Sequence, residues 1–252
     1  MTAAAPVSSD PIVIAIWHGS RDPLAAAGFE QFVRACRSRL APISVWGGQL
    51  ECAESSLAEQ LSQLVEVRMA TEHLAESPSA KRHAIALPVF MGAGVHVSED
   101  IPAAIAAVCQ QYPAFEIQTL PPLGRAPELA DVLSDRCMAH PDVEAWIVWG
   151  HGSRLPAMAK GLVRTRQQLA ARLPNRPVDL AFWSQSPNWQ DAVEALVHQG
   201  YERVGIVPCF WFAGGLVERL HAEVRAWQSR HEGREVTISE VLTPHSLWVE
   251  AV

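Results

Sequence analysis

Several features that would place the chain outside the ordinary globular class are missing from its 252 residues. No apolar run approaches the ~18–20 residues that cross a bilayer. The opening segment MTAAAPVSSDP has neither a basic region nor an apolar core, so we expect no secretory signal. The formal net charge of −7 disfavours non-specific binding to nucleic acid. We therefore expect a cytoplasmic protein that binds neither membranes nor nucleic acid.

Cysteine is scarce, and the motifs of two common enzyme classes are missing. No two cysteines form a C-x-x-C pair, and an odd, dispersed set predicts reduced thiols that lie mostly in the core. The chain has no G-x-S-x-G elbow, which leaves an α/β-hydrolase as a weak alternative. It also has no G-x-G-x-x-G, which weakens a dinucleotide-binding interpretation. The five cysteines are Cys36, Cys52, Cys109, Cys137 and Cys209.

The chain does contain one ten-residue sequence pattern twice. Residues 12–21 read IVIAIWHGSR, and residues 145–154 read AWIVWGHGSR. Each is a short apolar run, typical of a strand buried on both faces, and each stops at a histidine and a glycine. The repeat predicts two similar halves, and the apolar fraction of 49% is sufficient to build a core in each.

Strand and helix patterns alternate through both halves, which predicts an α/β fold with two tandem parallel sheets, flavodoxin-like in each half. His151 follows His18 by 133 residues and Pro208 follows Pro88 by 120, so the polar stretch 68–82 absorbs the difference. We expect domains at 1–140 and 141–252. Expected strands are 12–17, 43–50, 83–91, 115–120, 146–149, 178–183, 204–210 and 236–241. Expected helices are 24–40, 55–65, one capped by Ser98, 127–137, 156–173, 191–199, 214–227 and one from Ser246.

Three polar side chains follow three expected strands of the first half. His18 follows the first strand, Glu51 the second and His96 the third. Ligands of parallel α/β sheets bind beyond the carboxyl ends of the strands. Two imidazoles and a carboxylate suit divalent iron, cobalt, nickel or zinc, and they can equally accept protons near neutral pH. Taken singly, each has a structural alternative as a loop, helix-start or surface residue.

The second half provides an internal control for this set. Aligning the two patterns places His151 on His18, but Ser184 on Glu51 and Leu216 on His96. The pattern of the fold is kept and the polar set is not. We therefore expect one half with an active cluster and one with a degenerate site.

These motifs together resemble a known family. They are the HGSR turn, a glutamate at the end of the second strand, and P-x-F-x-x-x-G-x-H-x-x-x-D-I-P at 88–102. The chain resembles the class II tetrapyrrole chelatases, in particular the two-repeat sirohydrochlorin chelatases of the CbiX/SirB kind, from about residue 11 to the end. The resemblance implies chelatase-like domains that face each other across a cleft.

The resemblance also implies an activity. A divalent metal, Fe²⁺ or Co²⁺, would be a substrate, inserted into sirohydrochlorin or a related tetrapyrrole for siroheme or cobalamin biosynthesis, with no permanently bound cofactor. His18, Glu51 and His96 fall on the metal-binding and proton-handling positions. We expect a monomer, with a homodimer as the alternative. A non-catalytic tetrapyrrole- or metal-binding protein on the same scaffold remains open.

The implied substrate carries eight carboxylates, so its pocket should offer hydrogen-bond donors. Serines and arginines beside the two HGSR turns flank helix N-termini, which favour anions. The expected substrate-binding residues are Ser20, Arg21, Gly94, His151, Ser153 and Arg154.

Overall fold

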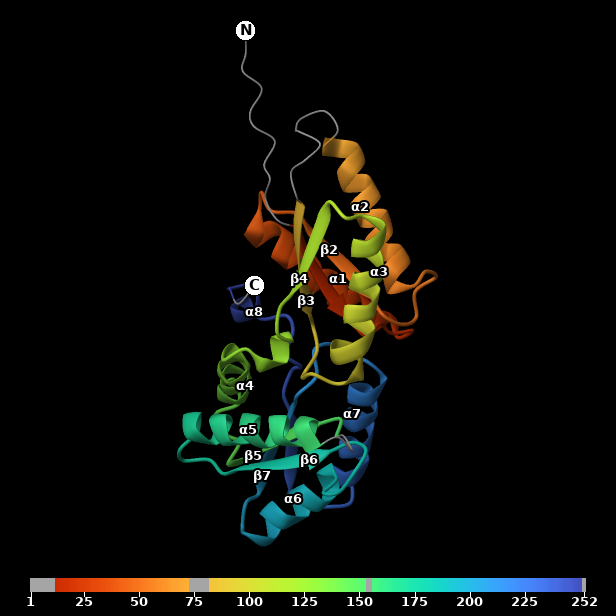
Figure 1. Cartoon of the computed structure of the whole chain (residues 1–252). Coiled ribbons are helices and arrows are strands. Elements are labelled where there is room, and N and C mark those ends of the chain that lie inside the picture. Colours follow the sequence, from red (N-terminus) through yellow and green to blue (C-terminus); the bar gives the residue numbers. More distant parts are fainter. Residues whose placement is uncertain (1–11, 73–81, 153–155, 251–252) are drawn as a thin grey trace. The chain divides into compact units, whose positions relative to one another are not determined.

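The computed structural model describes residues 12–72, 82–152 and 156–250. It contains two four-stranded parallel sheets with helices packed on them, which confirms the predicted α/β class (Figure 1). The chain forms two compact units. The first comprises Met1–Arg21 and Val33–Leu123, and the second comprises Asp22–Phe32 and Gly124–Val252. Within the described ranges, none of the helices combines the length and apolarity needed to cross a membrane.

The first sheet has the strand order β2-β1-β3-β4. Its strands are β1 (Ile12–Trp17), β2 (Val45–Gln49), β3 (Arg82–Pro88) and β4 (Phe115–Thr119). All six residues of β1 are buried, as expected for a central strand with both faces covered. The chain runs from β1 outward to β2 and returns to β3 on the other side. The carboxyl ends of β1 and β3 therefore flank a topological switch point, where α/β proteins bind ligands.

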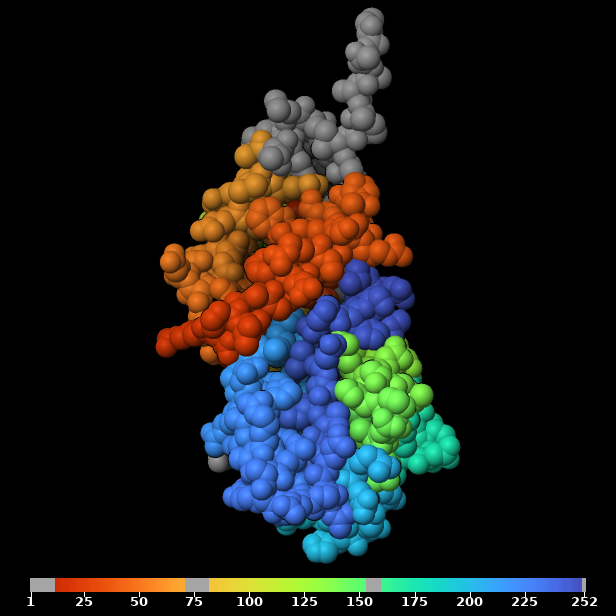
Figure 2. All heavy atoms as spheres, turned by 180° about the vertical axis from the view of Figure 1, so that it is seen from behind, coloured from red at the N-terminus to blue at the C-terminus, as the bar shows by residue number. Residues whose placement is uncertain are grey.

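Helices cover both faces of the first sheet. On one face, Ile12, Ile14 and Ile16 of β1 pack with the apolar stripes of α2 (Leu57–Glu72) and α3 (Ile101–Gln111). Helix α1 (Pro23–Leu40) lies in the red-to-orange segment seen from behind in Figure 2, and its Arg37 donates a hydrogen bond to the carbonyl of Val45 in β2. A π-helical turn, η1 (His96–Asp100), precedes α3 directly, and a short 3₁₀ turn, η2 (Leu123–Arg125), follows β4.

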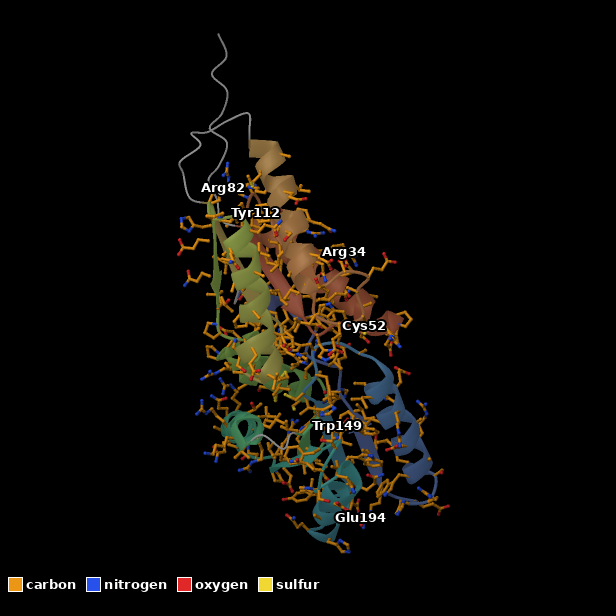
Figure 3. The ribbon with its side chains drawn as sticks, turned by 45° about the vertical axis from the view of Figure 1, so that its right-hand side comes forward. Arg34, Cys52, Arg82, Tyr112, Trp149 and Glu194 are labelled. Atoms are coloured by element: carbon orange, nitrogen blue, oxygen red, sulfur yellow. The ribbon has the colours of Figure 1, made fainter. Side chains whose placement is uncertain are left out.

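The second sheet repeats the order, as β6-β5-β7-β8. Its strands are β5 (Ala145–Gly150), β6 (Val178–Phe182), β7 (Arg203–Pro208) and β8 (Glu235–Ile238). The helices are α5 (Pro156–Arg172), α6 (Trp189–His198), α7 (Gly215–Gln228) and α8 (Ser246–Glu250). Trp149 of β5, labelled in Figure 3, is fully buried in the core that α6 and α7 cover.

Helix α4 (Glu128–Met138) belongs to the second unit, although its sequence precedes the predicted boundary at residue 140. It packs against α5 and β7. Arg136 of α4 also donates hydrogen bonds to the carbonyl oxygens of Val241 and Pro244. These contacts explain why a helix from the first repeat groups with the second sheet. The division at residue 140 stays a prediction about the sequence repeat.

Backbone hydrogen bonds support the alignment of the two strand-end turns. In the first unit, the N–H of Glu51 donates to the carbonyl of His18 at 2.8 Å. In the second, the N–H of Ser184 donates to the carbonyl of His151 at 2.9 Å. The φ angles of the glycines that follow the histidines are also alike, at +93° for Gly19 and +84° for Gly152. The two turns therefore share one backbone structure, and they differ in the neighbouring residue, which is Glu51 in the first unit and Ser184 in the second.

Two expectations about helix boundaries are wrong. Ser98 does not cap the helix that follows β3, because helical structure begins two residues earlier at His96, and the Ser98 hydroxyl donates back to the carbonyl of Gly94. Helix α2 extends to Glu72 rather than ending at Val65. Part of the polar stretch 68–82 is therefore a helix extension, and residues 73–81 lie outside the described residues.

Candidate metal-binding site

His18 stands at the carboxyl end of β1, held there by a turn that requires glycine. Gly19 has φ +93°, which side-chain-bearing residues rarely adopt. A Cβ on Gly19 would also lie 1.9 Å from the carbonyl oxygen of Glu51. The turn and the loop after β2 therefore touch through their backbones. The His18 side chain stays 49% exposed, so solvent and solutes reach it.

Glu51 follows β2 and turns its carboxylate toward His18. The Glu51 Oε2 atom lies 3.7 Å from His18 Nε2, too long for a good hydrogen bond but close enough for both atoms to share an ion. The carboxylate is 54% exposed. Cys52 comes next with φ +63°, in the left-handed region where non-glycine residues are uncommon, and it is exposed (Figure 3).

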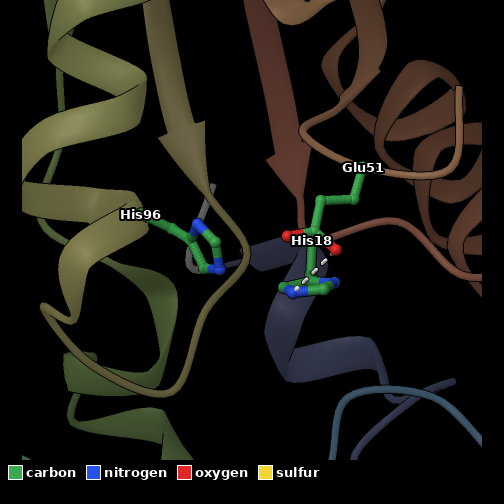
Figure 4. A group of neighbouring side chains, drawn as sticks. All are labelled: His18, Glu51 and His96. Carbon is green, nitrogen blue, oxygen red and sulfur yellow. Dashed lines mark ion pairs between the residues drawn. The ribbon is translucent and has the colours of Figure 1, made fainter.

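His96 is the first residue of η1 and approaches from the loop after β3. Its ring meets the ring of His18 edge to face, with centroids 4.9 Å apart (Figure 4). Its Nδ1 atom lies 2.6 Å from Oδ2 of Asp100, one turn further along. Phe90 lies beside the His96 ring at 6.1 Å. His96 thus has an apolar neighbour and a charged partner, and it faces the other two residues.

One potential ligand atom from each of His18, Glu51 and His96 lies within 4.8 Å of the others. Among the residues that the structure describes, no other His, Cys, Asp or Glu group of three or more meets this criterion. An ion bound at about 2.1 Å by each ligand would hold the ligand atoms roughly 3–3.5 Å apart. The cluster is slightly wider than that, and the side chains of His18 and Glu51 are exposed while that of His96 is half-buried. The arrangement suits an ion that is accepted and released more than a closed structural site.

The predicted substrate-binding residues lie in several turns and loops of the chain. Ser20 and Arg21 follow the His18 turn, where Arg21 is exposed and Ser20 is half-buried. Gly94 has a backbone role, because its carbonyl accepts the N–H groups that open the helical region at Val97 and Ser98. Their binding of substrate stays a prediction. Ser153 and Arg154 lie outside the described residues.

The corresponding place in the second unit has a different character. His151 is exposed and keeps the Nδ1 contact with the following glycine carbonyl, 3.2 Å away, that His18 also makes. Ser184, in the place of Glu51, uses its hydroxyl to donate to the His151 carbonyl at 2.8 Å. Leu216, in the place of His96, packs against the hydrophobic core. This half has no carboxylate or second imidazole at those positions.

Three of the five cysteines lie in the core, in agreement with the expectation that most of them do. Cys36, Cys137 and Cys209 are buried, whereas Cys52 is exposed and Cys109 is half-buried. Burial raises the pKa of Cys36 to about 11 and that of Cys209 to about 12. The pKa of Cys137 is also raised by burial. These three thiols remain protonated near neutral pH and are poor metal ligands.

Sequence reasoning included Asp100 in a motif but assigned it no role. The structure shows its carboxylate against His96. The signal in the sequence was the spacing of four residues, which places two side chains on the same side of a helical turn.

Comparisons with known proteins agree with this architecture. The CbiX family model matches residues 12–139 and 145–252. A sirohydrochlorin cobaltochelatase of Priestia megaterium is 25% identical over 163 residues, which are 62% of this chain. The match spans about half of that relative, 53% of its length.

Two solved structures show the same fold. The sirohydrochlorin chelatase SirB from Bacillus subtilis subspecies spizizenii, in complex with cobalt, matches with a TM-score of 0.74 and 19% identity, over 96% of this chain and 92% of that one. SirB from Bacillus subtilis with Fe³⁺ matches with a TM-score of 0.77 and 22% identity, over the same shares. The fold is thus that of the two-domain chelatases. By its family match, the chain belongs to the CbiX family.

Proposed function

We propose that the protein is a sirohydrochlorin chelatase that inserts Fe²⁺ or Co²⁺ into the macrocycle, for siroheme or cobalamin biosynthesis. The observation that carries this proposal is the open cluster of His18, Glu51 and His96 at the carboxyl edge of the first sheet. Family membership and the sirohydrochlorin cobaltochelatase relative support the choice of substrate. In this proposal the metal is a substrate and needs a site that releases it.

The chemistry of insertion explains why imidazoles and a carboxylate are needed together. A free divalent ion is strongly hydrated, and a pyrrole N–H is a poor acid. His18 and His96 would replace water on one side of the ion, leaving its other positions open to the macrocycle nitrogens. Insertion releases two pyrrole protons. Glu51, 3.7 Å from His18, would accept one as the ion leaves, and the other would pass to a freed imidazole or to solvent. Holding ion and macrocycle together makes the step effectively unimolecular.

The substrate carboxylates need donors, and the proposal assigns these to residues near the two turns. Ser20, Arg21 and Gly94 lie beside the metal cluster in the sequence of the first half, and His151 occupies the equivalent turn of the second. Ser153 and Arg154 complete the proposed set. A cleft between two domains, a monomeric state and a cytoplasmic location are parts of the same proposal.

The direct test mixes the purified full chain with sirohydrochlorin and either Co²⁺ or Fe²⁺, and follows the absorption spectrum of the macrocycle. Acceleration over the metal and macrocycle alone is the expected result. An unchanged rate, with sirohydrochlorin or Co²⁺ still bound, would establish the non-catalytic binding protein instead. Parallel kinetics with Fe²⁺, Co²⁺ and Ni²⁺ would rank the metals, because a ligand set of this kind accepts several.

A further inference from the structure

We propose that Asp100 is a positioning residue for His96, and that one inserted residue in the π turn η1 brings it there. The inference rests on the proposed function for its meaning in catalysis. Asp100 Oδ2 lies 2.6 Å from His96 Nδ1. Carboxylate oxygens accept hydrogen bonds, so this contact favours the tautomer of His96 that carries its hydrogen on Nδ1. The lone pair of the ring is then on Nε2, which becomes the nitrogen available to a metal.

The two sheets show that the first half has one residue more between its third and fourth strands. Ala84 of β3 pairs with Ile117 of β4, 33 residues later. Val204 occupies the same place in β7, because Ala84 and Val204 pair with the first residues of β1 and β5. Val204 pairs with Val236 of β8, 32 residues later. The difference of one residue therefore comes from sheet register and does not depend on how the helices are aligned.

The start of each helical region limits where the extra residue lies. In the first half, the carbonyl of Gly94 accepts the N–H of Val97. In the second half, the carbonyl of Gly214 accepts the N–H of Val217. Both glycine carbonyls also accept the N–H of the next residue along. The two halves therefore align without an insertion as far as Val97 and Val217.

The buried faces of the helices give the other limit. Ile101 is the first fully buried residue after Val97, four positions on, whereas Leu220 follows Val217 by three. From there the buried positions recur with identical spacing in the two helices. They are Ile101, Ile105 and Val108 in α3, and Leu220, Val224 and Trp227 in α7. The extra residue thus lies among residues 98–100.

That segment is the π turn. The N–H of Ile101 donates to the carbonyl of His96, a five-residue hydrogen bond instead of the four-residue bond of an α-helix. Such a turn absorbs one additional residue while the buried face after it keeps its place. The insertion therefore widens the helix where His96 stands and leaves Ile101 in the core. Helix α7 is α-helical from Gly215, and Leu216 stands in the place of His96.

The π turn and the Asp100 carboxylate together hold His96 in place at the metal site. Without Asp100, the His96 ring is free to rotate and to carry its proton on either nitrogen. With Asp100, the ring orientation and the proton position are both fixed before an ion arrives. Carboxylates that hold a ligating histidine in this way usually contribute ~10–100-fold to metal affinity or activity.

The test compares Asp100→Asn and Asp100→Ala with Glu99→Gln in the full chain. Glu99 is an exposed acid in the same turn, so its variant removes the same charge without touching His96. Co²⁺ affinity is measured from the visible absorption of the bound ion, and KM for Co²⁺ is separated from kcat in the insertion assay. We expect the two Asp100 variants to bind Co²⁺ ~10–100-fold more weakly, with an altered spectrum and a raised KM for metal. The control should change by less than about threefold.

The outcomes separate the inference from the proposed function. If the wild type inserts metal and the Asp100 variants behave like Glu99→Gln, the positioning role is overturned. If the wild type binds Co²⁺ without inserting it and the Asp100 variants still bind more weakly, the proposed function fails and the positioning role stands. Thermal unfolding is the check on folding. If Asp100→Ala lowers the unfolding midpoint, the isosteric Asp100→Asn decides.

Discussion

The first and second units share the same strand-end turn, yet only the first surrounds its histidine with further ligands. His18 and His151 have the same backbone hydrogen bonds and the same following glycine conformation. Glu51 and His96 accompany the first, whereas Ser184 and Leu216 occupy these places in the second. The backbone of the turn is the same in both units, whereas the side chains around it differ, so the turn serves as a scaffold. The chemistry comes from the residues delivered to it by the neighbouring strands.

The largest expected effect comes from removing a ligand. We predict that His18→Ala and His96→Ala each lower the insertion rate by at least about a hundredfold, more than the loss of an outer carboxylate would cause. The His18 side chain is exposed and that of His96 is only half-buried, so neither variant should unfold the protein. Steady-state kinetics with sirohydrochlorin and Co²⁺ provide the measurement.

His151→Ala is the matched control for these two variants, since His151 occupies the same turn in the other half. We expect a much smaller loss of insertion rate and unchanged Co²⁺ affinity. A loss equal to that of His18→Ala would contradict a single active half.

A second prediction concerns the glycines of the two turns. Gly19→Ala places a Cβ against the Glu51 carbonyl, at 1.9 Å, so the Glu51 loop must move. Gly152→Ala meets the Ser184 hydroxyl at 2.8 Å, which can rotate away, and side-chain atoms of Gln185 and Phe182 at 3.1 and 3.2 Å, which need only small shifts. Both substitutions should lower the free energy of unfolding, each by about 1–2 kcal/mol for the backbone conformation alone. Gly19→Ala should be the more destabilising of the two.

Chemical denaturation and Co²⁺ titration of both glycine variants would show whether their effects differ. Only Gly19→Ala should weaken Co²⁺ binding, by roughly tenfold or more, since it displaces a ligand. Equal effects of the two variants on Co²⁺ binding would mean that the Glu51 loop is not part of the metal site.

Features of this site that depend on neighbouring residues can be predicted from the sequence, whereas features that depend on residues far apart in the chain cannot. The strand 12–17 and the three strand-end ligands follow from local apolar runs and from the rule that parallel strands end at one edge. The position of the π turn η1 cannot be predicted in this way, because a π turn has no local composition signal. It emerges only when the buried positions of α3 and α7 are compared.

The grouping of α4 was also beyond sequence reasoning. Its apolar stripe indicates a buried face but does not say which sheet that face covers. Contacts with α5 and β7 settle the matter in the structure. Long-range packing of this kind is decided by surface complementarity that a single sequence does not display.

The smallest expected effect is the creation of a weak Co²⁺ site in the second unit. The double variant Ser184→Glu with Leu216→His would give His151 the two companions that it lacks. We predict a second Co²⁺ site, ~10–100-fold weaker than the first because α7 has no π turn with an aspartate to hold the new imidazole. A Co²⁺ titration of this variant should show two classes of site. Continued binding of one ion would mean that side chains alone do not make the site.

The most direct test of a single metal-binding half is a Co²⁺ titration of the wild-type chain beside His96→Ala and His151→Ala. Visible absorption reports the bound ion and equilibrium dialysis counts it. We predict one bound Co²⁺ per chain, lost in His96→Ala and retained with the same spectrum in His151→Ala. Two equivalent ions in the wild type, or loss of the ion in His151→Ala, would contradict the assignment of the metal to His18, Glu51 and His96.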